Sequence, residues 1–438
     1  MFSYYLRLSW LSLKRNPLLS SLMVGAIALG IGVSMTTLTL FYVMSSDPLP
    51  FKSDRVFAVQ MDTWGPDEPA NRKGGGSPPI QMTYRDAMAL MESDIPTHQA
   101  TMLHRGFAVR TEDEDVRLQR LSARATYNGF FPMFDVPFLY GGPWDDRADE
   151  NADQVVILSR ESNEKFFGGQ NSVGNTIFLD SVPFRVVGVI NSWQPTPVFY
   201  DLNNGAWSST EDMFIPFQIP ITWEYGAHGS TNCWKPEKLE NYQDSLQSEC
   251  VWVQHWVQLD SAEQREAFHA FMDGYANAQK EFGRFQRPLD NRTTNVMDWL
   301  EYMEVVGDDN RLLVVLSLMF LLICLLNTVG LMLAKFLNRA PLVGVRRALG
   351  ASKRDVALQH GVEVMFIGLL GGLGGLVLSY LGLLAVRNWY TGYEYLARLN
   401  PEMIATAVAL ALGAAVIAGL YPTWHITRIQ PAVHLKTQ

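Results

Sequence analysis

Four stretches of the sequence are long and apolar enough to cross a lipid bilayer as helices. A crossing helix needs about 20 apolar residues, because the hydrocarbon core of a bilayer is about 30 Å thick. Soluble proteins rarely bury several helices of this length, and a cleaved signal peptide has a shorter apolar core. We therefore expect four transmembrane helices. The uncharged stretches are 18–44, 312–334, 364–386 and 403–424.

Basic residues mark one side of the membrane. Lys and Arg outnumber Asp and Glu in the short segments 1–17, 335–363 and 425–438. Short cytoplasmic segments of membrane proteins are enriched in Lys and Arg, so we expect these three segments, and both termini, in the cytoplasm. The 45–311 domain and the short 387–402 loop are then expected on the outer side.

The N-terminal segment has an amphipathic pattern. Trp10 and Leu13 belong to an apolar face at helical spacing, and Arg7, Lys14 and Arg15 lie elsewhere on the helix. This pattern predicts a helix in the headgroup region, with its cations near anionic lipids. An unstructured leader is the alternative.

The domain between the first two membrane helices is acidic. Residues 47–311 contain 40 Asp and Glu against 22 Lys and Arg, whereas the other 173 residues contain 4 acidic and 13 basic ones. A nucleic-acid-binding protein needs a basic face, so the sequence argues against that class. The apolar and aromatic content is high enough to form a core, which argues against disorder.

Short β-branched and aromatic runs alternate with helical patterns in this domain, which predicts a mixed α/β fold. A helix is expected after Ser261, and another from Met297 to Gly307 should continue into the second membrane helix as a stalk. The expected strands are 56–60, 155–158, 176–179, 184–190 and 252–259.

The external domain contains two cysteines, Cys233 and Cys250, which are 17 residues apart. In an oxidising compartment a disulfide between them would close a loop and contribute about 3 kcal/mol to stability. We expect this disulfide; two unpaired buried thiols are the alternative.

Small residues in the third membrane segment recur at the spacing that lets helices approach closely. They are Gly368 with Gly372 and Gly371 with Gly375. In the second segment, Asn327 is expected to hydrogen-bond a neighbouring helix, and a substrate contact is the alternative. Charged residues are absent from the middle of all four segments, so an ion gradient is not the expected energy source.

The sequence offers no motif for catalysis or for a cofactor. It lacks the G-x-x-x-x-G-K-[ST] loop that cradles nucleotide phosphates. The histidines of the external domain do not have the spacing of metal ligands. We therefore expect no catalytic, cofactor-binding or metal site in this chain.

The cytoplasmic segment after the second membrane helix contains the most informative pattern. Its apolar residues Leu342, Val345 and Leu349, followed by Ser352, recur at helical spacing. Such a helix could set an apolar edge into a groove of a partner; an ordinary basic loop is the alternative. The candidate coupling residues are Leu342, Gly344, Val345, Arg346, Arg347, Ala348, Leu349, Gly350, Ala351 and Ser352.

The string from Gly344 to Ser352 resembles the cytoplasmic motif of the FtsX-like permease family, which includes the MacB-type exporters. Three other stretches are similar to this family in the same order along the chain. Residues 127–131 and 155–189 resemble its periplasmic core domain, and residues 421–432 resemble its C-terminal pattern.

The resemblance implies the membrane subunit of a type VII ABC transporter in the bacterial inner membrane. Such subunits dimerise and couple to a cytoplasmic ABC ATPase, which would bind the ATP and Mg. Seventeen residues precede the first membrane helix, so we expect the ATPase on a separate polypeptide. The second permease is either another copy or a paralogue. The family often has an acidic residue two positions before Gly344, where this chain has Leu342, and this departure favours one half of a heterodimer.

The expected function is export of a periplasmic substrate, such as a drug, a peptide or a lipid-like molecule. A periplasmic adaptor and an outer-membrane channel are further candidate partners. The alternatives are an FtsX-like regulator of a cell-wall hydrolase, LolC- or LolE-like lipoprotein release, and a sensor without an ATPase. The large external domain favours export, because external domains of the FtsX branch are usually smaller.

Overall fold

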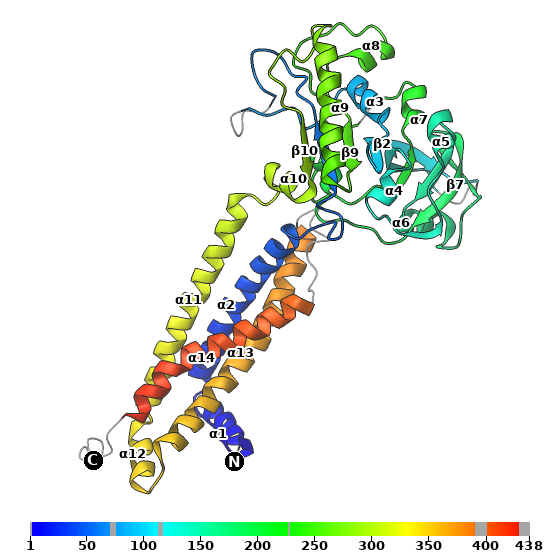
Figure 1. Ribbon diagram of the computed structural model, residues 1–438. Helices are drawn as coiled ribbons and strands as arrows, with labels where there is room; N and C mark the ends of the chain where they lie inside the picture. Colours follow the sequence, from blue (N-terminus) through cyan, green and yellow to red (C-terminus); the bar gives the residue numbers. More distant parts are fainter. Residues whose placement is uncertain (1, 71–75, 113–116, 227, 390–400, 429–438) are drawn as a thin grey trace. The chain divides into compact units, whose positions relative to one another are not determined.

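The chain folds into two compact units, Met1–Ser46 with Val306–Gln438 and Asp47–Val305. The computed structural model describes residues 2–70, 76–112, 117–226, 228–389 and 401–428 (Figure 1). The first unit is helical and the second is mixed α/β. This confirms the expected fold class, in which a mixed domain is inserted between the first and second membrane helices.

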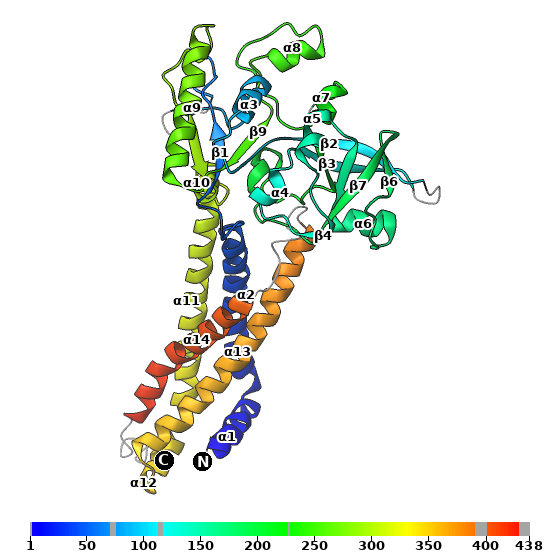
Figure 2. The same cartoon turned by 45° about the vertical axis from the view of Figure 1, so that its right-hand side comes forward.

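Four helices of the first unit are long and apolar enough to cross a membrane (Figure 2). Their apolar cores are the uncharged stretches of the sequence, but the helices extend beyond them and include charged residues near their ends. The described part of this unit also contains two shorter helices. The six helices are α1 (Phe2–Arg15), α2 (Pro17–Met44), α11 (Asp308–Leu337), α12 (Ala340–Ala348), α13 (Lys353–Trp389) and α14 (Pro401–Thr427).

The glycines of α13 lie where this helix packs against its neighbours. A Cβ added at Gly371 or Gly375 would come within 2.7 Å of a side-chain atom of Ile27 or Ile31 on α2. On another face, a Cβ at Gly368 would lie 2.1 Å from the Cβ of Ala415 on α14, and Gly372 similarly meets Ala411. The two small-residue stripes therefore let α13 approach α2 and α14 closely.

Asn327 does not make the expected contact within the single chain. Its side chain is exposed on α11, and no described residue hydrogen-bonds its amide. The neighbouring Thr328 is buried, and its hydroxyl donates to the carbonyl of Cys324 in the same helix at 2.8 Å. The helical rotation of 100° per residue turns Thr328 inward and leaves Asn327 on the outer face.

The second unit is built on a ten-stranded sheet, as far as its described residues show. The strand order is β10-β1-β9-β2-β3-β8-β5-β7-β4, and β6 pairs with β2 and β7. Most neighbouring strands are antiparallel; β3 with β8 and β5 with β7 are parallel. The strands are β1 (Val56–Gln60), β2 (His98–Arg110), β3 (Gln119–Thr126), β4 (Phe138–Gly141), β5 (Val155–Leu158), β6 (Thr176–Leu179), β7 (Val182–Ile190), β8 (Met213–Pro216), β9 (Gln254–Gln258) and β10 (Arg292–Asn295).

The longest helix of this unit, α9 (Ala262–Lys280), begins where the sequence predicts. The Ser261 hydroxyl accepts the backbone N–H of Gln264 at 3.2 Å, and the Gln264 side chain accepts that of Asp260 at 2.7 Å. The shorter helices are α3 (Tyr84–Met91), α4 (Phe130–Met133), α5 (Asp146–Asn151), α6 (Arg160–Phe167), η2 (Phe199–Asn204), α7 (Gln218–Thr222), α8 (Tyr242–Gln247) and α10 (Val296–Tyr302).

The stalk predicted to run unbroken from Met297 into α11 is interrupted. Helix α10 ends at Tyr302, Glu304 adopts a left-handed φ of 51°, and a new N-cap at Gly307 starts α11. The aromatic residues of α10 bind it to the external domain. Trp299 packs edge-on against Trp256 of β9 with 6.4 Å between the ring centroids, which fixes the helix there.

A buried ion cluster joins four parts of the external domain. Arg124 on β3 is buried, and its guanidinium donates to the carboxylates of Asp201 and Glu211. The Tyr200 hydroxyl donates to Glu211 at 2.8 Å, and the Gln254 amide donates to Asp201 at 3.0 Å. The cluster therefore fixes η2 and the segment before β8 against β3 and β9.

The buried His255 makes the stability of this domain depend on pH. It lies on β9 with Nδ1 2.9 Å from the Thr101 hydroxyl, and burial lowers its pKa from 6.5 to about 3. Between these two pH values the unfolded chain binds a proton that the folded chain does not. The contribution of neutral His255 to the free energy of unfolding is therefore fully present above pH 6.5. It is lost as the pH falls, by up to about 1.4 kcal/mol per pH unit.

We predict that His255→Gln flattens the pH dependence of unfolding between pH 6.5 and 3. Urea unfolding of the full chain, followed by tryptophan fluorescence over a pH series, measures this slope. The control is His269→Gln, because the His269 side chain is 41% exposed. An unchanged slope in the His255 variant would contradict this account.

Candidate functional site

The candidate coupling segment forms α12 and the turn that follows it. Ala340, Val343 and Gly344 face inward and are buried. On the opposite face, Leu342 is 63% and Leu349 is 83% exposed, and Val345 and Ala348 are also exposed. A helix with apolar residues on both faces has one face to pack within its own chain and one face left for a partner.

A tight turn connects α12 to α13. Gly350 adopts a φ of +105°, a conformation that residues with a Cβ rarely adopt. The half-buried Ala351 follows, and the Ser352 hydroxyl then accepts the backbone N–H of Asp355 at 3.1 Å. The Asp355 carboxylate in turn accepts the Ser352 hydroxyl at 2.6 Å. Ser352 is therefore the cap of α13, and the turn holds α12 at a fixed place relative to α13.

The two arginines of the motif are engaged within the chain. Arg346 donates to the Gln359 side chain of α13 at 2.5 Å, and Arg347 donates to the Thr427 carbonyl of α14 at 3.5 Å. These contacts hold α12 to α13 and α14, and they leave the apolar side chains as its most exposed feature.

A buried ion cluster centred on Glu363 lies beside this segment. The Glu363 carboxylate on α13 is 2.8 Å from the Lys335 ammonium of α11, and these side chains are 3% and 0% exposed. The Ser12 hydroxyl of α1 donates to the same carboxylate. Arg339 donates to the Ser12 hydroxyl at 2.6 Å and lies 3.6 Å from Glu363. The Lys335 ammonium also reaches the Ser20 hydroxyl of α2 at 3.4 Å.

This cluster fastens both ends of the coupling segment. Lys335 and Arg339 come just before α12, and Glu363 lies ten residues into α13, so α12 is held between two points of one ion-paired group. Sequence reasoning missed the cluster, because Ser12 and Glu363 are 351 positions apart. A charged residue at each border of an apolar stretch is ordinary, and periodicity does not reveal which of them meet.

We predict that Glu363→Gln destabilises the helical unit by about 3–5 kcal/mol, because it leaves the buried Lys335 ammonium without its counter-charge. The double variant Lys335→Met/Glu363→Gln removes both charges and should recover part of this loss. Thermal unfolding of the detergent-solubilised chain compares the two. If the double variant does not unfold at a higher temperature than the single variant, the pair does not act as described.

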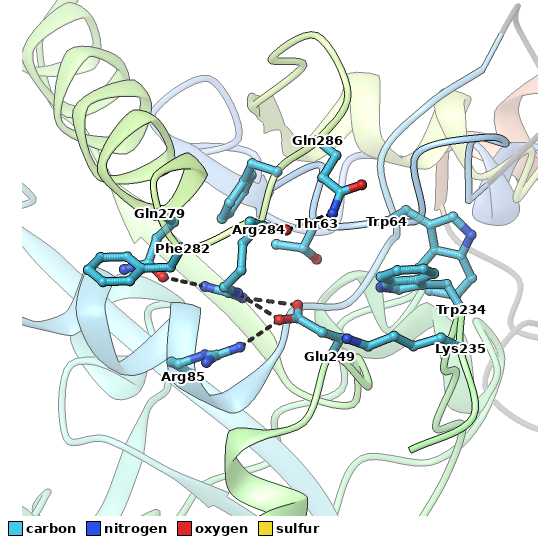
Figure 3. A pocket seen from close by; sticks show the side chains of 12 residues that line it. Thr63, Trp64, Arg85, Trp234, Lys235, Glu249, Gln279, Phe282, Arg284 and Gln286 are labelled. Carbon is cyan, nitrogen blue, oxygen red and sulfur yellow. Dashed lines mark hydrogen bonds and ion pairs between the residues drawn. The ribbon is translucent and has the colours of Figure 1, made fainter.

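The external domain contains a cavity of about 320 Å³ (Figure 3). Its walls come from four places: the segment after β1, the start of α3, the segments on either side of α8, and the end of α9 with the residues that follow it. Arg284 lies at its centre and donates to both Asp86 and Glu249. The lining residues labelled in the figure are Thr63, Trp64, Arg85, Trp234, Lys235, Glu249, Gln279, Phe282, Arg284 and Gln286.

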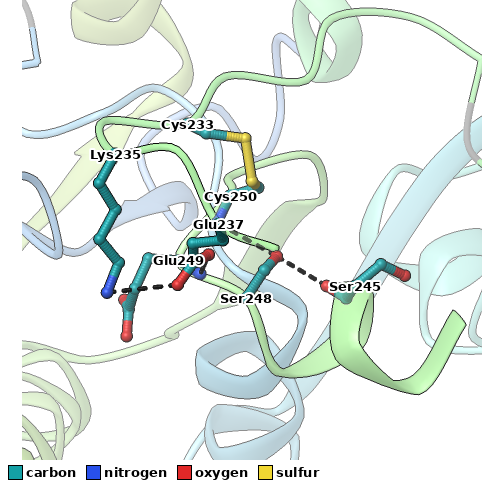
Figure 4. The surroundings of a disulfide bond; sticks show 7 residues. All are labelled: Cys233, Lys235, Glu237, Ser245, Ser248, Glu249 and Cys250. Carbon is teal, nitrogen blue, oxygen red and sulfur yellow. Dashed lines mark hydrogen bonds and ion pairs between the residues drawn. A yellow bond between two sulfur atoms is a disulfide. The ribbon is translucent and has the colours of Figure 1, made fainter. Parts of the chain in front are cut away.

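A disulfide between Cys233 and Cys250 lies directly beside this cavity (Figure 4). The backbone also pairs there, because Asn232 and Val251 exchange two N–H···O bonds of 3.1 and 2.8 Å. The residues next to the two cysteines, Trp234 and Glu249, both line the cavity. The described residues contain no group of three or more His, Cys, Asp or Glu that could hold a metal ion.

Comparison with known proteins identifies the class of the chain. The family described as the MacB-like periplasmic core domain matches residues 20–272, and the FtsX-like permease C-terminal family matches residues 314–431. The first match alone covers more than half of the 438 residues. The chain therefore belongs to the FtsX-like ABC transporter permeases with a MacB-like periplasmic core domain.

Several named relatives are similar in sequence to this chain. The chain is 23% identical to the macrolide export ATP-binding/permease protein MacB of Rhodospirillum rubrum, over 100% of this chain and 61% of that protein. It is 22% identical to the MacB of Syntrophobacter fumaroxidans, over 83% of this chain and 53% of that protein. It is 25% identical to the probable syringafactin export ATP-binding/permease protein SyfD of Pseudomonas syringae pv. tomato, over 81% and 46%. The chain thus spans about half of the length of the relatives it matches.

Among solved structures, the periplasmic region of MacB from Actinobacillus actinomycetemcomitans aligns with 58% of this chain and 94% of its own. The sequence identity is 12% and the TM-score is 0.36.

Proposed function

We propose that this chain is the membrane subunit of an ABC exporter, and that α12 receives the movement of a cytoplasmic ABC ATPase. One observation carries the proposal. The face of α12 that contains Leu342, Val345 and Leu349 is exposed, although these side chains are apolar and the rest of the helix is held rigidly. Such a helix can place its apolar face in a groove of a partner.

The ion cluster supports a mechanical role for this face. A push on α12 acts on α11 through Lys335 and Arg339, and on α13 through Glu363 and the turn at Gly350. Helices α2 and α11 are the two helices from which the chain enters and leaves the external domain. Movement of their ends is therefore passed to this domain through the covalent chain, without chemistry in the membrane subunit itself.

The partners follow from the same proposal. ATP and Mg would bind to the ATPase, and two permeases, either copies or paralogues, would face two ATPase domains. The names of the relatives refer to export of macrolides and of syringafactin. We extend export, but no particular substrate, to this chain. A periplasmic adaptor and an outer-membrane channel would complete the path if the substrate leaves the cell.

We predict that Leu349→Asp weakens binding of the ATPase and abolishes stimulation of its ATP turnover by the permease. A charge on the most exposed apolar side chain of α12 would have to be desolvated in the partner groove. Co-purification and ATPase assays in membranes measure both effects. The conservative Leu349→Met is the matched control and should retain both activities. Wild-type binding and turnover in the Asp variant would rule out α12 as the contact.

The proposed orientation places α12 in the cytoplasm and the external domain across the bacterial inner membrane. Val345 and Leu239 are 46% and 47% exposed, so cysteines at these positions are equally accessible. We expect a membrane-impermeant maleimide to label Leu239→Cys in right-side-out vesicles, and Val345→Cys only after the vesicles are opened. The native Cys324 is buried and provides the background control. Labelling of both variants in closed vesicles would refute the orientation.

A further inference from the structure

Aromatic side chains form part of the wall of the external cavity. Trp64 and Trp234 line one side, and Phe282 at the rim is 79% exposed. Trp234 lies directly on the backbone of Gly65, where an added Cβ would come within 2.7 Å of the indole ring. The indole is therefore held in place before any ligand arrives, and tryptophan surfaces of this kind are enriched where proteins bind ligands and partners.

The floor of the cavity is a fixed polar network. The Arg284 guanidinium donates to Asp86 at 2.7 and 2.8 Å and to Glu249 at 2.8 and 3.2 Å, and one further N–H reaches Gln279 at 3.0 Å. Arg85 donates to the same Glu249 at 2.7 Å. Glu249 is the only carboxylate among the described lining residues. Both of its oxygens thus accept hydrogen bonds, and the geometry of the floor is set in advance.

Hydrogen-bonding capacity remains on two cationic side chains of the lining, and on the buried Thr63 hydroxyl, which has no partner among the described residues and can donate or accept. Arg85 is 30% exposed and, in the described part of the chain, uses one N–H group for Glu249. Lys235 is 40% exposed, lies 5.0 Å from the Trp234 ring centroid, and is paired with Glu237 at 3.2 Å. A ligand amine would meet these cations and find the Glu249 oxygens already taken. A ligand oxygen would instead find free N–H groups beside an aromatic wall.

The disulfide holds the two sides of this arrangement together. Trp234 follows Cys233 and Glu249 precedes Cys250, so the bridge sets the distance between an aromatic wall and the polar floor. The volume of about 320 Å³ is at the lower end of the range for small-molecule sites, about 300–1,000 Å³. It fits one ring system with its substituents and is too small for a folded partner.

From this arrangement we infer that the cavity is a binding site for a small ring-containing molecule that carries a carbonyl or carboxylate oxygen. The ring lies against Trp64 and Trp234, and the oxygen accepts from Arg85 or Lys235. The site lies entirely within the external domain and does not depend on the proposed coupling to an ATPase.

The test uses three probes of one shape: benzoate, benzamide and benzylamine. Saturation-transfer NMR on the detergent-solubilised full chain detects binding at millimolar affinity. We expect transfer to the rings of benzoate and benzamide, and at least fivefold less to benzylamine. Trp234→Ala and Phe282→Ala should each lower the benzoate signal at least threefold. Phe282 is exposed at the rim, so its variant tests the site even if Trp234→Ala does not fold.

The matched control is Arg105→Met, because the Arg105 guanidinium also lies against an aromatic ring, that of Tyr225 at 4.0 Å, but outside the cavity. This variant should bind benzoate as the wild type does, and so should Leu349→Asp. Equal signals from all three probes, or a benzoate signal that survives Phe282→Ala unchanged, would overturn the inference.

Discussion

The Lys335–Glu363 ion pair determines how the helical unit behaves as a single body. Both side chains are nearly or fully buried, so separating them would leave a charge in a low-dielectric interior, at a cost of several kcal/mol. The pair therefore resists separation. Because Ser12, Ser20 and Arg339 join the same group, four helices share this one fixed point beside α12.

Close packing of small residues also holds the helices of this unit together. The cluster fixes one end of α13, and the glycine stripes of α13 fix its middle against α2 on one side and α14 on another. Small residues give these helices contact over a long surface, and dispersion between close backbones replaces the hydrophobic force that lipid does not supply. In the proposed mechanism, a displacement of α12 would therefore move whole helices, because close-packed interiors resist local deformation.

The sequence predicts the features that depend on local patterns. The four apolar helices, strands such as β5, and the Ser261 cap follow from length, periodicity and capping chemistry. Features that depend on contacts between residues far apart in the chain do not follow from local sequence patterns. Glu363 is an ordinary border residue until the fold brings Ser12 to it. Trp299, in the short helix before the break at Tyr302, packs on Trp256 of a distant strand, and no local signal reveals that contact.

The two candidate sites differ in how their charges are used. At α12 the two arginines make hydrogen bonds within the chain, and the exposed surface is apolar. Such a surface suits a protein partner that buries a whole face. In the external cavity the Glu249 carboxylate already accepts hydrogen bonds from two arginines, and N–H groups remain beside two indoles. This arrangement suits a small ring that carries an oxygen. The excess of acidic over basic residues in the external domain does not change which polar groups are available in the cavity. Recognition depends on which polar groups are left without partners at the site, and the net charge of a domain does not report that.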